Sequence, residues 1–362
     1  MNTRKLRELG QSLWLDNITR DLLDSGTLQR YIDEWSVSGL TSNPTIFDEA
    51  IGGSAAYDRA IRNAANGAQS DEALFVELAL DDLKRAADML RPIFAVTHGV
   101  DGWVSMEVSP LLVDDTSGTI EAATRIFAQA KRPNLFVKIP GTTAGIAAIE
   151  ESIFNGIPIN VTLLFSREQY VAAAEAYLRG IERRIAAGRS PVVASVASLF
   201  VSRWDKAVAD KVPPMMHNRL GIAIAQRTYV ACLGLYSSAR WQKLAAAGAR
   251  PQRLLWASTG TKDPSVPESL YAEAFAAPDT IDTLPEKTLL ALSKMEAVPP
   301  LMDTAGADSE RTLDEFANEN VDLDALAQKL QEDGAAAFVK SWHHLMQNIA
   351  DKGETLARVV NR

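Results

Sequence analysis

The sequence predicts an α/β protein of the (β/α)8 TIM-barrel class, and three observations lead to this prediction. About eight short apolar runs rich in Val, Ile, Leu or Trp recur along the 362 residues. Each is followed by a polar cluster and a longer amphipathic stretch, the alternation of strands and helices found in a parallel sheet. No Pro-, Gly- or Ser-rich linker divides the chain. We therefore expect one closed barrel; a doubly wound open sheet is the alternative, but no G-x-G-x-x-G motif follows the first run.

The expected strands are defined by the apolar runs, and the last of these runs is the weakest. They span residues 12–18, 38–46, 102–108, 134–140, 158–165, 191–200, 252–259 and 279–284. Residues 1–362 are expected to form a single barrel domain, with about 298–362 as additional C-terminal helices packed on it. The acidic composition of this tail is equally compatible with a lid over the barrel mouth and with packing below the barrel.

Several helical stretches carry signals for where they begin or end. Ser166 followed by Gln169 has the spacing of a capping box, and Gly188 stands where a C-terminal cap is expected. The stretch 220–248 is unusually long and is expected to hold more than one helix. The segment IPGTTAG (139–145) lacks the terminal G-K-[ST] of a phosphate loop, so it is expected to lead into the next helix.

Composition restricts the partners that the protein can bind. The chain is 47% hydrophobic and 23% charged, as in a soluble globular protein with a large core. Its net charge of -9 argues against nucleic acid or an anionic membrane as a partner, because such polyanions require a basic surface. Any bound anion must therefore find a local cluster of Arg or Lys. A monomer and a homodimer are both compatible with the sequence.

Cysteine and histidine usage argues against a metal centre or a disulfide. Cys232 is the only cysteine, and the four histidines, two of them adjacent near the C-terminus, are scattered without ligand spacing. We expect no cofactor and no metal. The charged N-terminal segment and the lack of a run long enough to span a membrane make a reducing cytoplasm the expected location.

Polar side chains end or follow most of the predicted strands. In a (β/α)8 barrel the active site is assembled at the carboxyl ends of the strands, so these side chains are expected to converge. Each of them alone has a simpler explanation as a turn residue, a helix cap or an ion-pair partner. The set consists of Asp16, Thr41, Asn43, Glu107, Lys138, Asn160, Thr162, Ser198, Arg203, Ser258 and Lys262.

Lys138 is the most unusual member, because it lies in the apolar run NLFVKIP (134–140). A buried ion pair with Asp16 or Glu107 would explain it, and so would a catalytic role. A lysine in an apolar pocket near other cations loses its proton more easily and can attack a carbonyl carbon to form a Schiff base. The protonated imine draws electrons from the adjacent carbon–carbon bond, which breaks or forms if a nearby acid/base group moves the alcohol proton.

Six segments, in order, resemble transaldolase, a Schiff-base enzyme of the non-oxidative pentose phosphate pathway. They are LTSNPTIF, VSMEVSP, LFVKIPGTTAG, INVTLLFS, SVASLFVSRWD and LLWASTGTKDPS. The likeness spans residues 12–290 and is strongest to the long bacterial subgroup. The segment DKVPPMMHNRLGIAIAQRTYVACLGLYSS is also similar to the transaldolase part of fusions with phosphoglucose isomerase.

The resemblance implies a metal-independent transferase of the Schiff-base aldolase type that acts on phosphorylated sugars. Lys138 would form the imine with sedoheptulose 7-phosphate or fructose 6-phosphate, and Asp16 would take the proton of the hydroxyl whose carbon–carbon bond breaks. Glu107 and Thr162 would hold the water that shuttles protons. The dihydroxyacetone unit would bind to Asn43 and Asn160, with Thr41 and Ser198 lining the same pocket.

The same resemblance assigns the phosphate ligands. Arg203 would bind the substrate phosphate, because a guanidinium matches phosphate oxygens bidentately, and Ser258 would assist it. Shorter members of the family carry a second arginine just after this serine, whereas the nearest cation here is Lys262.

Three other functions are weighed against the transferase. A fructose 6-phosphate aldolase would use the same imine but release free dihydroxyacetone; family members of that kind have a tyrosine at the position of Glu107 and much shorter chains. A catalytically dead sugar-phosphate-binding barrel would have lost Lys138, Asp16 or Glu107, and all three are present. A metal-dependent barrel hydrolase would require histidines at strand ends, which the four histidines avoid.

Overall fold

The computed structural model describes residues 2–64, 70–295 and 297–360, and it confirms the (β/α)8 barrel. Eight strands form one sheet in the order β2-β1-β8-β7-β6-β5-β4-β3, and every pairing within it is parallel. Each expected apolar run overlaps one strand, which is generally shorter than the run because the flanking residues belong to turns; β2 begins at Val37, one residue before its expected run. The strands are β1 (Ser12–Asp16), β2 (Val37–Thr41), β3 (Val104–Glu107), β4 (Leu135–Pro140), β5 (Ile159–Leu164), β6 (Ser195–Phe200), β7 (Arg253–Ala257) and β8 (Ile281–Leu284).

The barrel closes where β2 meets β3, through a single parallel bridge between Gly39 and Trp103. Leu40 donates its backbone N–H to the Trp103 carbonyl at 2.9 Å. Gly39 is required at this seam, because a Cβ there would lie 2.6 Å from the indole of Trp14. The missing side chain therefore lets β2 approach the aromatic interior closely enough to close the sheet.

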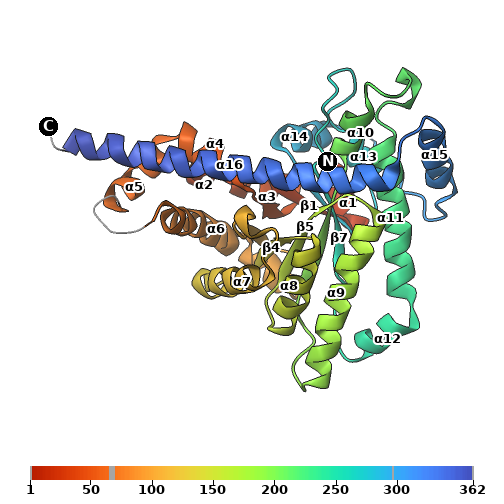
Figure 1. Ribbon diagram of the computed structural model, residues 1–362, viewed down its shortest axis with the longest axis horizontal. Coiled ribbons are helices and arrows are strands. Elements are labelled where there is room, and N and C mark those ends of the chain that lie inside the picture. The colour runs from red at the N-terminus through yellow and green to blue at the C-terminus, as the bar shows by residue number, and fades with distance from the viewer. Residues whose placement is uncertain (1, 65–69, 296, 361–362) are drawn as a thin grey trace.

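Helices cover the outside of the barrel in the order that the sequence pattern predicts (Figure 1). The stretch 220–248 forms two helices, α11 and α12, as expected. The helices are α1 (Asn2–Glu8), α2 (Arg20–Asp24), α3 (Thr27–Trp35), α4 (Pro44–Gly53), α5 (Asp58–Ala64), α6 (Asp71–Val96), α7 (Thr116–Ala130), α8 (Thr143–Phe154), α9 (Arg167–Ala186), α10 (Ser202–Val208), α11 (Leu220–Ser237), α12 (Ala239–Ala246), α13 (Leu270–Ala274), α14 (Glu286–Lys294), α15 (Ala307–Asn318) and α16 (Leu323–Val360), with short 3-10 turns η1 (Ala55–Tyr57), η2 (Pro110–Leu112) and η3 (Pro214–Met216).

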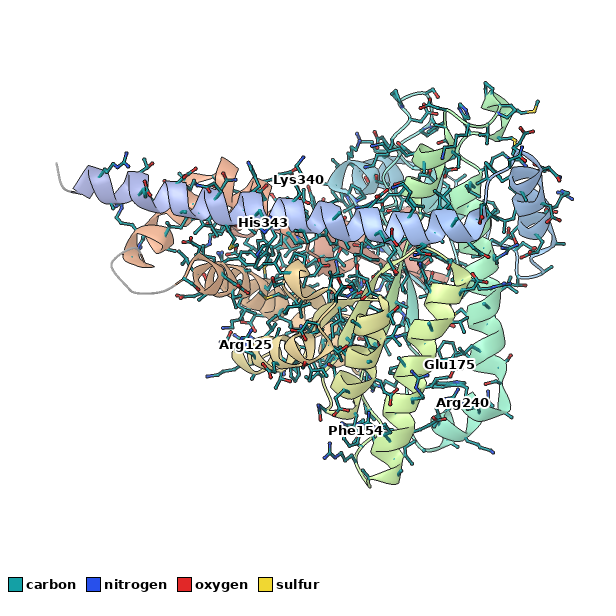
Figure 2. The ribbon with its side chains drawn as sticks, in the orientation of Figure 1. Arg125, Phe154, Glu175, Arg240, Lys340 and His343 are labelled. Carbon is teal, nitrogen blue, oxygen red and sulfur yellow. The ribbon has the colours of Figure 1, made fainter. Side chains whose placement is uncertain are left out.

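The predicted ends of α9 are confirmed, with one difference in the capping pattern. Ser166 is the N-cap and accepts from the Gln169 backbone N–H at 3.2 Å. The Gln169 side chain accepts from the Phe165 N–H at 2.7 Å rather than from Ser166, so the reciprocal bond is displaced by one residue. Gly188 follows the helix with φ of +66°, the left-handed conformation that favours glycine. On the outer face of α9, Glu175 accepts from Arg240 of α12 at 2.6 Å (Figure 2).

The C-terminal helix α16 is 38 residues long and runs along the longest axis of the molecule (Figure 1). It contacts α4, α5, α6, η2 and β5. Its outward face is polar, with Lys340 and His343 exposed (Figure 2). Its buried positions recur at helical spacing, as expected for a helix packed by one face only. They are Ala327, Leu330, Gly334, Phe338, Trp342, Leu345 and Ile349.

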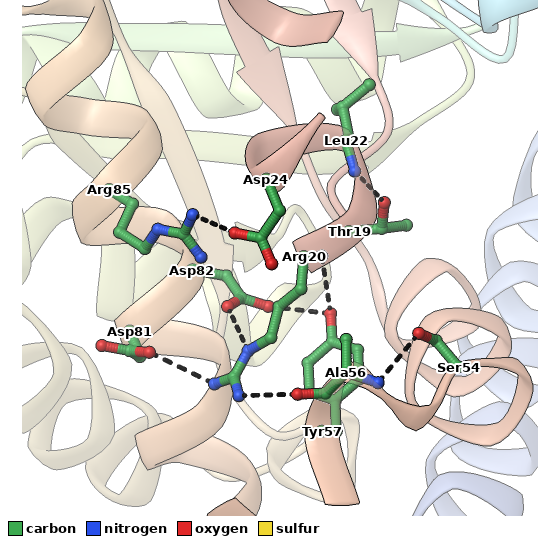
Figure 3. Close-up of polar contacts among 10 residues, drawn as sticks. All are labelled: Thr19, Arg20, Leu22, Asp24, Ser54, Ala56, Tyr57, Asp81, Asp82 and Arg85. Atoms are coloured by element: carbon green, nitrogen blue, oxygen red, sulfur yellow. Dashed lines mark hydrogen bonds and ion pairs between the residues drawn. The ribbon is translucent and has the colours of Figure 1, made fainter. Parts of the chain in front are cut away.

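A buried ion pair anchors the segment that follows β1 (Figure 3). Arg20 donates through Nε to Asp82 Oδ1 at 2.8 Å, and Tyr57 donates its hydroxyl to the other oxygen of Asp82 at 2.8 Å. The Arg20 guanidinium also reaches Asp81 at 3.2 Å and lies 4.6 Å from the centre of the Tyr57 ring. Burial raises the pKa of Asp82, and the hydrogen bond and charge of Arg20 oppose this rise. The cluster joins α2, η1 and α6 near the barrel mouth.

Candidate active site

Lys138 lies near the carboxyl end of β4 and is only 5% exposed. Register places Glu107 of β3 on one side of it and Asn160 of β5 on the other. Its Nζ donates to the backbone carbonyl of Ser42 at 3.0 Å and lies 3.6 Å from Glu107 Oε2. The ion pair proposed from the sequence therefore forms with Glu107, but at a separation longer than a hydrogen bond.

Aromatic side chains fill the barrel below Lys138. Residues two apart on a strand share a face, so Phe136 points to the same side as Lys138. The Phe136 ring stacks on Trp103 with centroids 4.1 Å apart, and Trp14 lies 6.2 Å from it. Lys138 therefore has an apolar floor with polar groups around its ammonium, which is the pocket that the sequence predicted.

Two carboxylates stand near the lysine, and burial raises the pKa of each. Asp16 ends β1 and accepts from the Thr41 hydroxyl at 2.7 Å. Desolvation raises its pKa, while this hydrogen bond and the charges of Lys138 and Lys262 act in the opposite direction. Desolvation also raises the pKa of Glu107, opposed by Lys138. Both carboxyl groups thus accept a proton more readily than an exposed acid does, as proton transfer requires.

A chain of hydrogen bonds orients Asn160 on β5. Ser198 of β6 donates to its Oδ1 at 2.7 Å, and its Nδ2 donates to Ser105 Oγ of β3 at 3.2 Å. In contrast, the hydroxyl of Thr162 is buried without a hydrogen-bond partner among the described residues. Because buried polar atoms are normally paired, this hydroxyl is free to bind a water or a substrate atom.

Asn43, a residue predicted to bind the substrate, also uses part of its side chain to cap a helix. Its Oδ1 accepts from the Ile46 backbone N–H at 3.0 Å, so it is the N-cap of α4. The two explanations considered for this residue, a cap and a substrate ligand, are compatible, because capping uses only the carbonyl oxygen and leaves the amide N–H groups.

Cations gather on the side of the mouth formed by β6 and β7. The side chain of Arg203, on α10, has no hydrogen bond or ion pair with any residue that the structure describes. Its guanidinium lies 5.3 Å from the centre of the Phe200 ring. Burial lowers the pKa of Lys262, and repulsion from Lys287, Arg203 and Lys206 adds to this effect. Mutual repulsion among partly desolvated cations favours binding of an anion between them.

Ser258, in the turn after β7, connects this turn to the start of α10, where Arg203 and Lys206 lie. Its hydroxyl shares a hydrogen bond of 2.9 Å with Ser202, and its carbonyl accepts from the Ser202 backbone N–H at 3.1 Å. It has φ of +55°, a sparsely populated conformation for a residue with a side chain. The turn after β7 is therefore held against the start of α10, next to Arg203.

Two cavities adjoin the predicted site, and a larger one does not. A cavity of about 310 Å³ is bordered by Ser202, Lys206 and Lys262, and another of about 450 Å³ by Asp16 and Glu286. A third, of about 950 Å³, lies against α6 and α7 and contains none of the predicted site residues. The chemistry of the lining, rather than volume, identifies the functional site here.

Comparison with known proteins agrees with this geometry. Residues 13–349 match the family model described as transaldolase/fructose-6-phosphate aldolase. The chain is 42% identical over 355 residues to a transaldolase of Thiobacillus denitrificans, covering 96% of this chain and 99% of that protein. It is 40% identical over 359 residues to a transaldolase of Thermobifida fusca, covering 96% and 97%. It is 37% identical over 375 residues to transaldolase 2 of Nostoc punctiforme, covering 98% of each.

The chain belongs to the transaldolase/fructose-6-phosphate aldolase family. The resemblance found in the six sequence segments is thus confirmed, and the names of these relatives support a transferase of carbohydrate metabolism. The roles of individual residues remain predictions, which rest on the geometry above.

Several residues of this family member reach the site without having been selected from the sequence. Ser42 accepts from Lys138 through its backbone carbonyl, and its hydroxyl donates to the Ser105 carbonyl at 2.8 Å. Ser105 is the second residue of the short strand β3, and a serine at either position is too common to be a signal. Thr283 shares a hydrogen bond of 2.6 Å with Thr41 and lies on β8, the weakest predicted strand. Lys206 could have been found, because it lies one helical turn after Arg203, on the same face of α10.

Two features that the described residues lack are relevant to metal and membrane functions. Within residues 2–64, 70–295 and 297–360, no group of three or more His, Cys, Asp or Glu side chains could hold a metal ion. No helix in the described part of the chain is long and apolar enough to cross a membrane.

Proposed function

We propose that this protein is a transaldolase that transfers a dihydroxyacetone unit between phosphorylated sugars. The donor is sedoheptulose 7-phosphate or fructose 6-phosphate, and the acceptor is glyceraldehyde 3-phosphate or erythrose 4-phosphate. The observation that carries the proposal is the buried Lys138, 3.6 Å from Glu107, beside a Thr162 hydroxyl that lacks a partner among the described residues. The names of the relatives support the same reaction. A cytoplasmic location and a monomeric or dimeric state stay predictions.

The first half of the reaction forms an imine on Lys138. The neutral amine attacks the donor's ketone carbon, and a proton moves to the ketone oxygen to give a carbinolamine. This intermediate then takes up a proton on its hydroxyl group and loses water to become a protonated imine. Glu107 and Thr162, on either side of β4, would hold the water that carries these protons, because the carboxyl group exchanges protons and the hydroxyl both donates and accepts.

Cleavage follows from the position of Asp16 across the mouth. Its carboxylate takes the proton of a hydroxyl on one of the two carbons joined by the bond that breaks. This is the carbon that becomes the aldehyde of the departing aldose phosphate. The bond's electron pair moves toward the imine nitrogen and leaves an enamine on Lys138, while the aldose phosphate departs with a new aldehyde group. The enamine attacks the acceptor aldehyde by the reverse steps. Asn160, fixed by Ser198 and Ser105, and the amide of Asn43 would hold the hydroxyls of the retained unit.

Arg203, with Lys262 and Ser258, would bind the substrate phosphate. Arg203→Met is expected to raise KM for phosphorylated donors roughly 10- to 100-fold, because charge-assisted hydrogen bonds are the strong ones. Lys262→Met should raise it less, since its ammonium is a point charge on a flexible stem. Steady-state kinetics with fructose 6-phosphate measures both; an unchanged KM in either variant removes that residue from the phosphate site.

The decisive experiment is borohydride reduction of the protein with fructose 6-phosphate, followed by mass spectrometry. The expected product is a three-carbon adduct on Lys138, absent from Lys138→Arg. An adduct on another lysine, or turnover by Lys138→Arg, contradicts the proposal. The matched family also contains the aldolases, so free dihydroxyacetone should be measured with and without acceptor. Its release at the full rate without acceptor would make the protein a lyase.

A further inference from the structure

Strand β5 has an irregularity at the point where it presents Thr162. The register between β5 and β6 shifts between Val161 and Leu164, so two residues of β5, Thr162 and Leu163, lie opposite one residue of β6. This arrangement is a β-bulge, a feature that changes the direction of a side chain at a strand end. Leu163 has φ of +57°. A residue other than glycine adopts this left-handed backbone conformation only where its surroundings impose it.

The surroundings that hold the bulge come from α16. Gln331 Nε2 donates to the Leu163 carbonyl at 2.9 Å and to the Gly141 carbonyl at 3.1 Å. Gly141 directly follows β4 and donates its own N–H to the Thr162 carbonyl at 2.8 Å. One amide of the C-terminal helix therefore ties together the ends of the two strands that carry Lys138 and Thr162.

One helical turn further on, Gly334 brings the same helix close to Arg203. A Cβ at this position would lie 3.0 Å from Leu163 Cδ2 and 3.1 Å from Arg203 Nη1. Glycine is normally unfavourable inside a helix, so its occurrence here reflects the need for space. The adjacent Asp333 acts electrostatically on Arg203, although burial has the larger effect and lowers the Arg203 pKa.

We propose that Gln331 and Gly334 are positioning residues of the transfer reaction, through which α16 completes the active site. Gln331 fixes the bulge that aims the Thr162 hydroxyl, and Gly334 leaves the space in which the Arg203 guanidinium faces the mouth. The inference rests on the proposed function. It assigns the two residues to different steps: Gln331 affects the chemistry on Lys138, whereas Gly334 affects recognition of the phosphate.

The role of Gln331 is tested with Gln331→Met, which keeps most of the side-chain volume, and with Gln331→Ala. Both should lower kcat about 10-fold or more, with KM changed less than about 2-fold, because the misplaced group acts in the proton-transfer steps. Gln328→Ala is the matched control, since within the described part of the chain the Gln328 side chain bonds only to the exposed Glu332 of the same helix. Equal kcat in the Gln331 and Gln328 variants would overturn the role of Gln331.

The role of Gly334 is tested with Gly334→Ala, whose new methyl group makes the end of the Leu163 or the Arg203 side chain give way by a few tenths of an ångström. The ratio of kcat/KM for fructose 6-phosphate to that for unphosphorylated fructose should fall about 5-fold or more, because only the first donor uses the guanidinium. Gly353→Ala is the control on the same helix, where a Cβ would meet nothing closer than Ile61 at 3.9 Å. An unchanged ratio in Gly334→Ala would overturn this role.

Wild-type protein separates failure of this inference from failure of the proposed function. If wild type gives no borohydride-trapped adduct on Lys138, the proposed function fails. If wild type gives the adduct and turns over, but the α16 variants match their controls, only the positioning roles fail. A Tm measured for each variant identifies those that do not fold, and Gln331→Met is the variant least affected by lost packing.

Discussion

Two clusters of buried charge in this protein, one around Lys138 and one around Arg20, use similar residue types with different outcomes. In the Arg20 cluster both oxygens of Asp82 accept hydrogen bonds of 2.8 Å, one from Arg20 and one from Tyr57. In the Lys138 cluster the cation and carboxylate approach only to 3.6 Å, and Glu107 Oε2 has no hydrogen bond among the described residues.

The difference shows what distinguishes a structural charge cluster from a reactive one. When both oxygens of a carboxylate accept short hydrogen bonds from protein groups, those bonds favour its charged form. A carboxylate with an oxygen that accepts no hydrogen bond can still exchange a proton with a substrate or a water. The Lys138 cluster also has an unpaired hydroxyl, Thr162, within the described part of the chain. Burial alone does not separate the two clusters, because Asp82, Lys138 and Thr162 are all buried.

The largest expected effect separates activity from stability at Lys138. Lys138→Met should reduce turnover at least about 10³-fold, equivalent to about 4 kcal/mol in the activation free energy, because the amine that forms the imine is lost. Its Tm should fall less than that of Asp82→Asn, since Glu107, whose pKa burial already raises, can become neutral without its partner. Kinetics and thermal unfolding of both variants measure this; a larger Tm loss at Lys138 would contradict the comparison.

Asp282 on β8 is a further buried carboxylate. The nearby Thr259 hydroxyl donates to the Thr283 carbonyl, and neither carboxyl oxygen of Asp282 has a hydrogen-bond partner among the described residues. Burial raises the pKa of Asp282 to about 8, although the Thr259 hydroxyl acts to lower it. The folded protein therefore keeps a proton that the unfolded chain loses near pH 4, so this stability is present at low pH and is lost as the pH rises toward 8. Between pH 5 and pH 8, wild type should lose about 4 kcal/mol of unfolding free energy relative to Asp282→Asn.

Urea unfolding of wild type and Asp282→Asn at several pH values tests this prediction, because the effects of all other groups cancel between the two proteins. Parallel stability curves would mean that Asp282 is solvated or paired in solution.

The paired cluster is tested through Asp82→Asn. Removing the charge leaves the largely buried Arg20 with the exposed Asp81, at 3.2 Å, as its remaining counter-ion among the described residues, so the unfolding free energy should fall by about 3 kcal/mol. kcat should remain within about 2-fold of wild type, because the cluster does not contact the site around Lys138. Asp88→Asn is the control: Asp88 pairs with Arg132 while 55% exposed, and its loss should cost less than about 1 kcal/mol. If the two variants lose equal amounts of unfolding free energy, burial does not make the Arg20–Asp82 pair contribute more to stability than the exposed pair.

The smallest expected effect is at Thr162. Thr162→Val replaces an unpaired buried hydroxyl with a methyl group of similar size, so stability should stay the same or rise by up to about 1 kcal/mol. kcat should fall about 10-fold, equivalent to about 1.4 kcal/mol, because the proton-carrying water loses a ligand. Thr162→Ser restores the hydroxyl and should recover most of the rate; if valine and serine variants react equally fast, the hydroxyl has no role.

The fold was predictable because it depends on periodicity that is local in the sequence. Each of the eight apolar runs overlaps a strand, and even the weak run 279–284 contains β8 (Ile281–Leu284). The strand-end rule also brought Asp16, Glu107, Lys138 and Asn160 to one mouth. These predictions succeed because a parallel barrel leaves the carboxyl ends of its strands no other arrangement.

What the sequence could not predict depends on contacts between distant segments. The Ser42 carbonyl that accepts from Lys138 carries no residue-type signal. The bulge at Leu163 has neither glycine nor asparagine to announce a left-handed residue, because Gln331 of α16 holds it instead. For the same reason the acidic tail could not be assigned to one end of the barrel, since its place depends on contacts with distant segments, among them those with Gly141 and Leu163.

The position of α16 has a consequence for how the protein is made. All eight strands precede it in the chain, and protein domains form from the N-terminal side during synthesis. A growing chain that has been translated as far as β8 already contains every strand-borne group of the site. The bonds from Gln331 to the ends of β4 and β5 can form only after residues 331–334 have been translated. The chain should therefore become fully active late in translation, after its barrel has been assembled.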